Sequence, residues 1–561
     1  MSSKPCIVSR ASLAVALLVT FGCDSETGLP GMPGPRGEQG PPGPAGPSGE
    51  LDPTLSTWDK AMIGIGGQGA LNALSGLTIA AAGVRRINGE GFRHHDWALT
   101  VDRFTTTTHI DVRQDAMRVD WSRSALFLGG VPLTYSEIIR GSLGCVDGDD
   151  NAFATDASTT DMPSARWAAV RKQVMLLNPH VLLAMVNENT SLLGDPDVDL
   201  HGGVVHELLV IADDVYPISV HVNPVTGRIA KVQTMENDHL HRDILIEVHF
   251  FDWVDDPGGG VSVPMSVFLT VNGEVWHEET RSQVTQNPAF TDQFDFPDTA
   301  DPKYDADAAR FGALSHQFIQ GFTSIGIPQQ VQQVEVIAET LATGVYFLGG
   351  STHNSMAIEN ETGVIVIEAP LYPERGQAIL DWVDSEIGKP VTHLMITHHH
   401  RDHAAGFRPF VVAGATIVVH ELSAKLYAEL AARPSTIVPD ALHANPQTPT
   451  IQVVPNGGLS IFSANPPFAN LAAVHVSTSH ASDMLLAYIG LPSGTNVTFQ
   501  SDLFNPDAAT GGSALVPEWA QQLREWFDAY SVYNPNDTLV GGHGTYAPLS
   551  QLEDYVNPPA P

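Results

Sequence analysis

Two patterns of hydrophobic and polar positions follow each other along the chain. In the first, from residue 51 to 330, short apolar runs alternate with polar residues between turn residues, which predicts a mostly antiparallel sheet with a few helices. Asn272-Gly273 lies inside Val267 to Trp276 and is a strong signal for a two-residue hairpin. A second hairpin is predicted at Ile218 to Val232, and a further strand at Ile244 to Trp253.

Helical periodicity interrupts this first pattern in two places. Ala70 to Leu74 predicts a short helix that leads into a strand from Leu77 to Ile87. Ser164 to Leu177 predicts an amphipathic helix, with Ser164 as its cap and Pro179 preventing its continuation. Pro297 to Pro302 is rich in turn residues and is interpreted as a linker between domains.

The second pattern, from Val334 to Pro561, alternates apolar strands with helices. Such alternation predicts a layered α/β arrangement. The predicted strands are Gly344 to Leu348, Gly363 to Ile367, Leu394 to Ile396 and Thr416 to Val419, and the predicted helices are Glu374 to Ile387 and Glu421 to Ala432.

Candidate chemistry is concentrated directly after the apolar run Val391 to Ile396. His398, His400, Asp402 and His403 follow within a few residues, and imidazole and carboxylate are the ligands that zinc accepts in a hydrolytic site. His398 and His400 can point the same way from extended chain. Asp402 and His403 follow after the chain turns and can face a second metal. The alternative is a solvated, histidine-rich loop.

This stretch resembles the HxHxDH signature of the metallo-β-lactamase superfamily, and three later residues resemble the remaining ligands of that family. His480 precedes the apolar strand Leu485 to Ile489, Asp502 follows Ser501 where the family has Gly, and His543 lies in a Gly-His-Gly element. The resemblance covers about Val334 to Pro561. It implies an αββα sandwich with metal ions at one edge of the sheets.

The resemblance also implies a ligand set for two metal ions per chain, expected to be Zn²⁺, with Fe or Mn as other divalent possibilities. The first metal would be held by His398, His400 and His480, the second by Asp402, His403 and His543, with Asp502 bridging the two. Glu368 is a candidate to support these ligands from outside.

A full ligand set implies a hydrolase (EC class 3) in which a dinuclear zinc-bound hydroxide attacks a small ester, lactone, thioester or amide. Asp402 would act as the catalytic residue that orients the hydroxide. Tyr546 and His353 are weak candidates for protonating the leaving group. Two alternatives stay open: a zinc β-lactamase-like enzyme, and a surface interaction module with a vestigial metal site.

The amino-acid composition indicates which kinds of molecule the protein can bind. The chain has 561 residues, too many for one core, and its 28 Lys and Arg against 63 Asp and Glu give a net charge of −35. A surface this acidic repels phosphate backbones, so no nucleic-acid partner is expected. A small-molecule substrate remains the expected partner.

The first 23 residues predict a targeting segment. A basic start with Lys4 and Arg10 is followed by a mostly apolar run, Ala11 to Gly22, and then by Cys23. This order resembles a bacterial lipoprotein signal, which implies lipidation of Cys23 and a membrane-anchored protein exported to the periplasm or cell surface. Ordinary secretion with cleavage near Gly22 is the alternative. If Cys23 is lipidated, Cys145 has no disulfide partner within the exported chain.

Residues 24–50 form a collagen-like segment. Glycine recurs at every third position from Gly28 to Gly49, with many prolines between. We favour a semi-rigid spacer, and a weak trimer held by this segment is the alternative. The predicted organisation is therefore a signal (1–23), a spacer (24–50), a mostly β domain of unknown role (51–330) and a metallo-β-lactamase-like domain (334–561).

Overall fold

The structure is a computed structural model. It describes residues 50–558 apart from 154–157, 186–196, 199–204, 212–215, 330–333 and 508. The predicted signal with Cys23, and the collagen-like segment up to residue 49, lie outside the described residues. Residues 49–561 form one compact unit. Among the described helices, none is both long and apolar enough to span a membrane.

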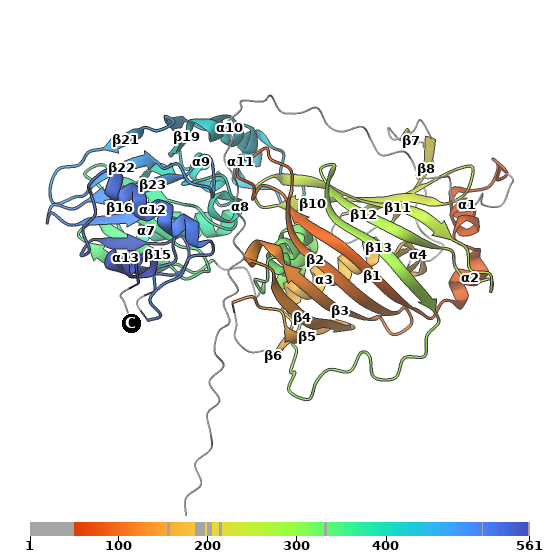
Figure 1. Ribbon diagram of the computed structural model, residues 1–561. Helices are drawn as coiled ribbons and strands as arrows, with labels where there is room; N and C mark the ends of the chain where they lie inside the picture. The colour runs from red at the N-terminus through yellow and green to blue at the C-terminus, as the bar shows by residue number, and fades with distance from the viewer. Residues whose placement is uncertain are drawn as a thin grey trace, which may run out of the picture. The chain divides into compact units, whose positions relative to one another are not determined.

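The N-terminal region, residues 51–330, is built on one 13-stranded sheet (Figure 1). Every neighbouring pair in it is antiparallel, and the strand order is β6-β5-β4-β3-β2-β1-β13-β12-β11-β10-β9-β8-β7. The strands are β1 Gly76–Ile87, β2 Leu99–Asp111, β3 Ala116–Ala125, β4 Val131–Arg140, β5 Leu143–Asp149, β6 Ser158–Asp161, β7 Asp197–Val198, β8 Val205–Ile211, β9 Ile218–Val222, β10 Ile229–Asp238, β11 Arg242–Val254, β12 Val263–Val271 and β13 Glu274–Gln286.

Both predicted hairpins are confirmed. Val271 pairs with Glu274 across Asn272 and Gly273, whose φ angles of 51° and 86° are the two positive values that a twisted two-residue hairpin needs. β9 and β10 form the second hairpin, in which Ile229 pairs with Val222. The strand predicted at Ile244 to Trp253 is β11, and the helix-to-strand prediction near residue 70 corresponds to α2 (Gln68–Ala73) and β1.

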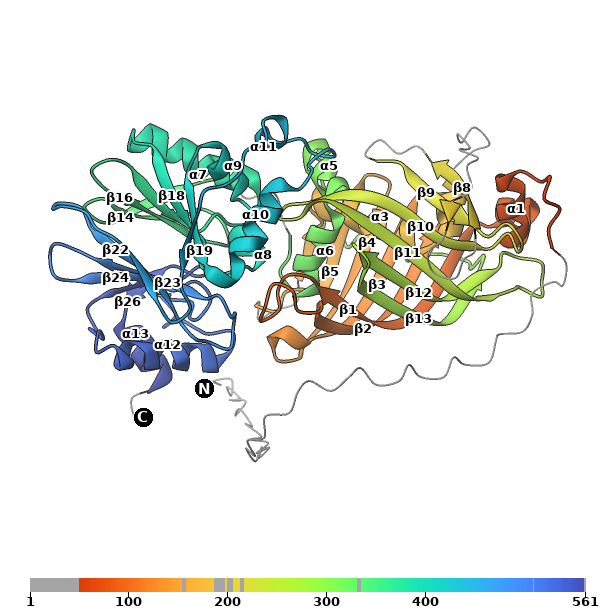
Figure 2. The same ribbon diagram turned by 90° about the horizontal axis from the view of Figure 1, so that it is seen from above.

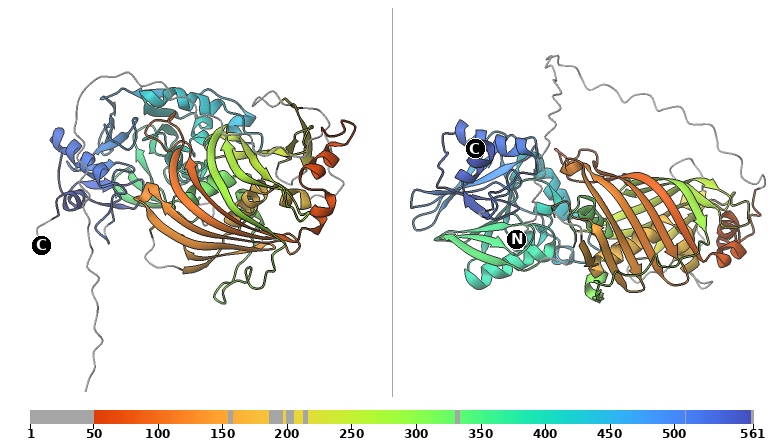
Figure 3. Two further views of the ribbon diagram at one scale, coloured as in Figure 1. Left: turned by 45° about the vertical axis from the view of Figure 1, so that its right-hand side comes forward. Right: turned by 60° about the horizontal axis from the view of Figure 1, so that its bottom comes forward.

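Helix α3, Ser164–Leu177, has the predicted bounds but a different environment. It packs against the sheet (Figure 3). Ten of its fourteen residues are buried, including Arg166, and the exposed polar face of an amphipathic helix is absent, because the residues on its outer face are half-buried: Trp167, Arg171, Lys172 and Met175. Arg166 is neutralised by Glu137, with Nε 2.8 Å from Oε1. Ser164 does not cap the helix; its hydroxyl accepts the Asp305 N–H instead. Pro179 does stop α3, and it begins α4 (Pro179–Met185).

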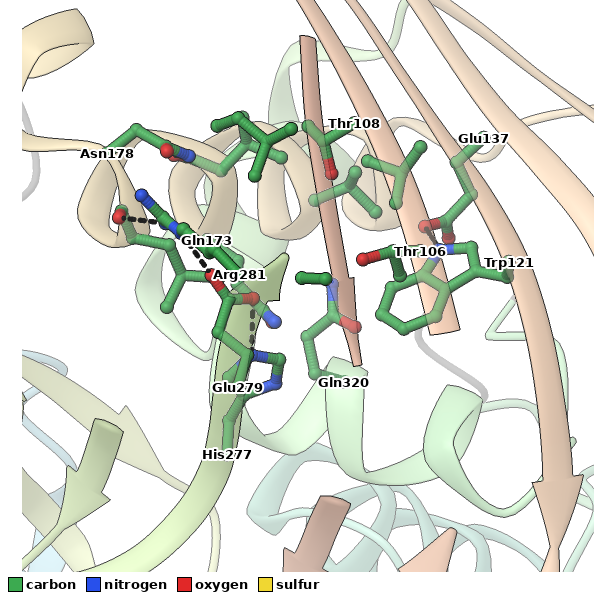
Figure 4. Close-up of a pocket in the computed structure, with 16 residues that line it drawn as sticks. Thr106, Thr108, Trp121, Glu137, Gln173, Asn178, His277, Glu279, Arg281 and Gln320 are labelled. Carbon is green, nitrogen blue, oxygen red and sulfur yellow. Dashed lines mark hydrogen bonds and ion pairs between the residues drawn. The ribbon is translucent and has the colours of Figure 1, made fainter. Parts of the chain in front are cut away.

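A small cavity of about 30 Å³ remains between α3 and the sheet (Figure 4). Part of its polar lining is paired, because Glu279 contacts His277 and accepts from Arg281, and Arg281 also donates to the Leu177 carbonyl. Gln173 Oε1 and Asn178 Oδ1 make no hydrogen bond among the described residues. The space holds no more than about two water molecules. This face of the sheet is therefore filled by protein.

The linker predicted at Pro297 to Pro302 does not separate domains. The chain after it forms α5 (Ala306–Leu314) and α6 (His316–Ser324), which return to α3. Phe318 and Phe322 of α6 share a hydrophobic cluster with Ala165 of α3 and Tyr372 of the C-terminal region. Two further helices of this region are short: α1 Thr57–Gly64 and the 3₁₀ helix η1 Leu126–Leu128.

The C-terminal region, residues 334–561, contains two sheets, and the predicted strands and helices are present (Figure 2). The first sheet consists of β14 Ile337–Ala342, β15 Val345–Gly349, β16 Ser355–Glu359, β17 Val364–Ile367, β18 Val391–Met395, β19 Thr416–His420 and β20 Ile451–Val454. The second consists of β21 Leu459–Phe462, β22 Asn470–His475, β23 Leu485–Gly490, β24 Asn496–Phe499, β25 Thr538–Val540 and β26 Tyr546–Pro548. The helices are α7 Pro373–Glu386, α8 Arg401–Ala404, α9 Arg408–Val412, η2 Glu421–Ser423, α10 Ala424–Ala432, α11 Ala441–Ala444, α12 Pro517–Ala529 and α13 Ser550–Val556.

Alternating side chains of these strands enter different cores. On β17, Ile365 and Ile367 belong to a cluster shared with the second sheet, while Val364 and Val366 pack with α7, α9 and α10. On β23, Leu485 faces the first sheet and Leu486 faces α12. Strands buried on both sides explain the continuous apolar runs that the sequence shows here.

Candidate metal centre

The predicted ligands all lie in loops at strand ends, although they are spread over residues 398 to 543. His398 and His400 follow β18, Asp502 follows β24, His543 follows β25, and His480 precedes β23. The Leu485 N–H donates to the Thr397 carbonyl at 2.7 Å, which fixes the His480 loop beside the His398 loop. The fold thus brings all seven predicted ligands together.

The first cluster consists of His398, His400, His480 and Asp502. Nε2 of His398 and Nε2 of His480 are 3.1 Å apart, and Asp502 Oδ2 lies 3.8 and 3.3 Å from them. Ligands arranged tetrahedrally about zinc at about 2.0–2.1 Å are roughly 3.4 Å apart. The spacing therefore fits a metal ion.

The second cluster consists of His353, Asp402, His403 and His543. Asp402 Oδ2 lies 3.6 Å from His403 Nε2 and 4.0 Å from His543 Nε2. His353 is the residue that the sequence offered as a candidate for protonating the leaving group. It contacts a predicted ligand directly, because its Nε2 lies 3.0 Å from Asp402 Oδ2.

Asp502 joins the two clusters. Its Oδ2 faces His398 and His480, while its Oδ1 lies 2.8 Å from His403 Nε2 and 3.5 Å from His543 Nε2. One carboxylate thus presents one oxygen to each cluster, which is the placement predicted for a bridging ligand.

Three buried polar atoms at this point make no well-aligned hydrogen bond among the residues that the structure describes: Asp402 Oδ1, Asp502 Oδ1 and His403 Nε2. Asp502 Oδ1 and His403 Nε2 lie 2.8 Å apart, so these two satisfy each other only as an ion pair. Buried polar groups without hydrogen bonds are costly, and a bound cation would satisfy them. The residues present therefore fit a metal-binding role.

Glu368 holds the second cluster from behind. It is fully buried, and its Oε2 accepts from His403 Nδ1 at 2.9 Å. Its Oε1 accepts from the hydroxyls of Thr397 and Ser501, each at 2.5 Å. An anion on the outer nitrogen of a ligating histidine fixes the ring and its tautomer, so Glu368 has the supporting place that the sequence suggested.

Gly542, directly before His543, has little room for a side chain. A Cβ at Gly542 would lie 3.0 Å from His403 Cε1 and 3.1 Å from the Ser501 Cα. These distances are tighter than ordinary Cβ contacts, so a larger residue would press against His403 and Ser501.

The N-terminal region reaches the site through the β1–β2 loop, residues 88–98. The Gly91 carbonyl lies 3.0 Å from Nε2 of both His399 and His400. Glu90 Oε2 lies 3.6 Å from His400 Nδ1 and also forms a candidate ligand group with Asp402. Sequence analysis missed Glu90 and Gly91, because nothing in the local pattern shows which distant residues a loop will meet.

His399, between two predicted ligands, turns away from the clusters. Its Nδ1 is 2.7 Å from Asp483 Oδ1, and Asp483 also accepts from the Ser423 hydroxyl. The adjacent Ser482 N–H donates to the Phe92 carbonyl at 2.8 Å. His399 therefore ties the ligand loop to its neighbours.

Burial sets the protonation of the imidazoles. Desolvation, with His480 nearby, lowers the pKa of His400 to about 3, and desolvation together with His353 lowers the pKa of His543 to about 4. Desolvation and the neighbouring imidazoles also lower the pKa of His398. These rings are neutral at pH 7 and present a lone pair without first losing a proton.

The carboxylates are held ionised. Desolvation raises the pKa of Asp502, but the charge of His403 outweighs it and holds that pKa well below its ordinary value. For His403 the balance is the opposite: desolvation is outweighed by Asp502 and Glu368, and its pKa is raised. Apart from His403, whose proton a metal ion would displace, the site combines anionic oxygens with neutral imidazoles, the donor set that divalent metals prefer.

Residues 348–464 match the family model of the metallo-beta-lactamase superfamily. This segment contains β16 to β20 and four of the predicted ligands, His398, His400, Asp402 and His403. The match supports metal-dependent hydrolysis as the general class of activity.

Solved structures give two further likenesses. A metallo-beta-lactamase from Pontibacter korlensis is 17% identical, with a TM-score of 0.30, over 40% of this chain and 97% of that chain. A B3 metallo-beta-lactamase described as having an active-site glutamic acid is 18% identical, with a TM-score of 0.29, over 40% of this chain and 87% of that one. A comparison with curated proteins found no match.

Proposed function

We propose that this protein is a hydrolase that uses two metal ions, expected to be zinc, to cleave an ester, lactone, thioester or amide. The observation that carries the proposal is the position of Asp502, whose two oxygens face two separate clusters of ligand atoms. His398, His400 and His480 would hold one ion, and Asp402, His403 and His543 the other.

Metal ions at these positions would lower the pKa of bound water and polarise the carbonyl under attack. The water oxygen forms a bond to the acyl carbon, the bond from that carbon to the leaving oxygen, sulfur or nitrogen breaks, and the leaving atom takes up a proton. The products are an acid and an alcohol, thiol or amine, so no oxidant or reductant is needed.

The protein's own groups position the water and manage its proton. Asp402 Oδ1 has no hydrogen bond within the described residues and can accept one from the attacking water. The other oxygen, Oδ2, is held by His353 Nε2 at 3.0 Å. His353 therefore fixes the orientation of the Asp402 carboxylate.

The wider organisation belongs to the same proposal. The two sheets with helices outside them form an αββα sandwich, and residues 334–561 form the catalytic domain. Residues 1–23 export the protein, Cys23 carries a lipid that anchors it to a bacterial membrane, and residues 24–50 act as a spacer. Support for the sandwich comes from the two sheets and their packing with the helices. Support for export, the lipid and the spacer comes from the sequence patterns alone.

Substitution of Asp502 by Ala tests the proposal. Asp502→Ala removes the shared ligand, so zinc content should fall below that of wild-type protein. Loss of several kcal/mol of transition-state stabilisation corresponds to a fall of several decades in turnover, at about 1.4 kcal/mol per tenfold. The measurements are zinc by mass spectrometry and turnover on a panel of neutral esters, lactones, thioesters and amides, with nitrocefin for the β-lactamase alternative.

Asp528→Ala is the matched control, since Asp528 lies on the exposed side of α12 and pairs only with Arg524 in the described chain. It should leave zinc content and turnover unchanged. Unchanged zinc and unchanged turnover in Asp502→Ala would contradict the proposal.

A further inference from the structure

A cavity of about 300 Å³ opens over both clusters. Its floor includes His400, Asp402, His480, Asp502 and His543, so any molecule bound in it lies against the candidate metal centre. This volume is at the lower end of the range, about 300–1,000 Å³, that small-molecule sites occupy. The cavity has the size of a substrate pocket.

The wall opposite the ligands is apolar and comes largely from the N-terminal region. Ile87 ends β1, Val101 lies on β2, and Phe127 and Leu128 belong to η1. Ile87 and Val101 are anchored in the sheet, with 4% and 0% of their surface exposed. The N-terminal region thus supplies a rigid hydrophobic surface.

Two further segments extend this wall. Ile325 and Ile327 follow α6, and Trp519 on α12 packs against the His480 ring, with centroids 4.3 Å apart. The apolar surface therefore continues from the sheet to the edge of the first cluster. A hydrophobic chain attached to a carbonyl at the clusters would remain in contact with it.

The cavity offers carboxyl side chains but no basic ones. Glu90, Asp402 and Asp502 line it, and no Lys or Arg is among the described residues that do so. A carboxylate or phosphate elsewhere on a substrate would find no cationic side chain to pair with. The lining favours an uncharged molecule.

We propose that the substrate is an uncharged carboxylic ester with a medium-length hydrophobic acyl group, and that the N-terminal region forms the pocket for this group. The scissile carbonyl lies at Asp402 and Asp502, and the acyl chain lies against Val101, Phe127 and Leu128. This inference rests on the proposed hydrolase function and adds the substrate class.

The size of the preference follows from hydrophobic transfer. Burying one methylene contributes about 0.8 kcal/mol, which is about fourfold in affinity. On zinc-loaded, full-length protein, kcat/KM for p-nitrophenyl esters should rise by up to about this factor per methylene from acetate to hexanoate. A p-nitrophenyl ester with a carboxylate at the end of its acyl chain should be hydrolysed at least tenfold less efficiently than the neutral ester of the same length.

Phe127→Ala removes part of the wall without touching a metal ligand. It should lower kcat/KM for hexanoate at least tenfold more than kcat/KM for acetate. Phe251→Ala is the control: Phe251 is on β11, is 48% exposed and does not line the cavity, so both rates should be unchanged. Equal kcat/KM for acetate and hexanoate in wild-type protein overturns the inference while leaving the hydrolase proposal in place.

A readout without metal or turnover tests the pocket itself. Metal-free protein should bind the neutral dye 6-propionyl-2-dimethylaminonaphthalene with a blue-shifted emission, and Phe127→Ala should bind it at least tenfold more weakly than Phe251→Ala. No binding by wild-type protein, or equal binding by the two variants, overturns the hydrophobic pocket. If dye binds as expected but no zinc binds and no ester is hydrolysed, the hydrolase proposal fails and the assignment of an ester fails with it.

Discussion

Buried carboxylates occur in both regions of the chain, but their partners differ. In the N-terminal region, Asp102 lies 2.7 Å from Arg123 and 3.2 Å from Arg85, and Glu137 pairs with Arg166. At the candidate metal centre, Asp402 and Asp502 face histidines, and no described Lys or Arg pairs with either of them.

The difference separates two uses of buried charge. A carboxylate closed by arginine is neutralised within the chain, so it stabilises a fold only as long as both partners remain. A group of carboxylates and mostly neutral imidazoles without arginine leaves lone pairs that an added cation can satisfy. Perturbed, buried titratable groups occur in both regions, and the identity of the partner shows which group is available for chemistry.

The largest expected loss of stability comes from breaking the buried carboxylate–arginine network of the N-terminal region. Asp102→Ala leaves Arg85 and Arg123 buried without their carboxylate, and the loss of one partner of a buried pair costs about 3–5 kcal/mol. Denaturant unfolding should show this loss of stability. Zinc bound per folded molecule should stay the same, and a parallel loss of zinc would break the distinction between the two regions.

Removing metal ions should destabilise the C-terminal region, which contains the candidate metal centre. A ligand that binds only folded protein stabilises it by about 2.7 kcal/mol at a hundredfold excess over Kd. Chelation with EDTA should therefore lower the melting temperature and increase hydrogen exchange around residues 398–403 and 480–502, but much less around β1 to β5. Asp502→Ala should lose most of this response, and uniform loss of protection over both regions would contradict it.

Glu368→Gln tests how much a supporting carboxylate contributes to metal affinity at the candidate metal centre. The substitution keeps the shape of the side chain but removes the anion that orients His403, and losses of this kind reduce metal affinity about 10- to 100-fold. Zinc titration against a competing chelator measures this. Glu374→Gln, in the first turn of α7 away from the clusters, is the control and should titrate like wild type.

The smallest expected effect is the loss of unfolding free energy that acid causes in the N-terminal region. Burial lowers the pKa of His180 to about 4, whereas in the unfolded chain it is about 6.5. The folded ring stays neutral, so its contribution to stability is complete above pH 6.5 and is lost as pH falls toward 4, by about 1.4 kcal/mol per unit. His180→Gln should remove this share of the slope in unfolding free energy between pH 7 and pH 5; an unchanged slope would show that His180 is protonated in the folded state.

The sequence predicted elements wherever the signal was local. The Asn272-Gly273 hairpin, the bounds of α3 and the strands β17 and β18 all follow from turn residues or periodicity within a few positions. The seven candidate ligands were predicted because their order resembles a known family, and the structure brings them together.

What the sequence did not show depends on contacts between distant residues. The burial of Ala165 and Ala169 on α3 follows from α5 and α6, which return from far along the chain. The contact of Glu90 and Gly91 with His400 follows from how the β1–β2 loop meets another region, and neither residue carries a recognisable motif. The hydrophobic periodicity of a helix or strand predicts which of its faces is buried. It does not predict which distant segment covers the opposite face.

The hydrogen bond between Gly91 and His400 also bears on how the protein folds. It joins residues 309 positions apart in the sequence. A contact between such distant residues forms only after a large loss of chain entropy, so it is expected to form late and slowly. The metal centre is therefore complete only after the β1–β2 loop and the C-terminal region have met.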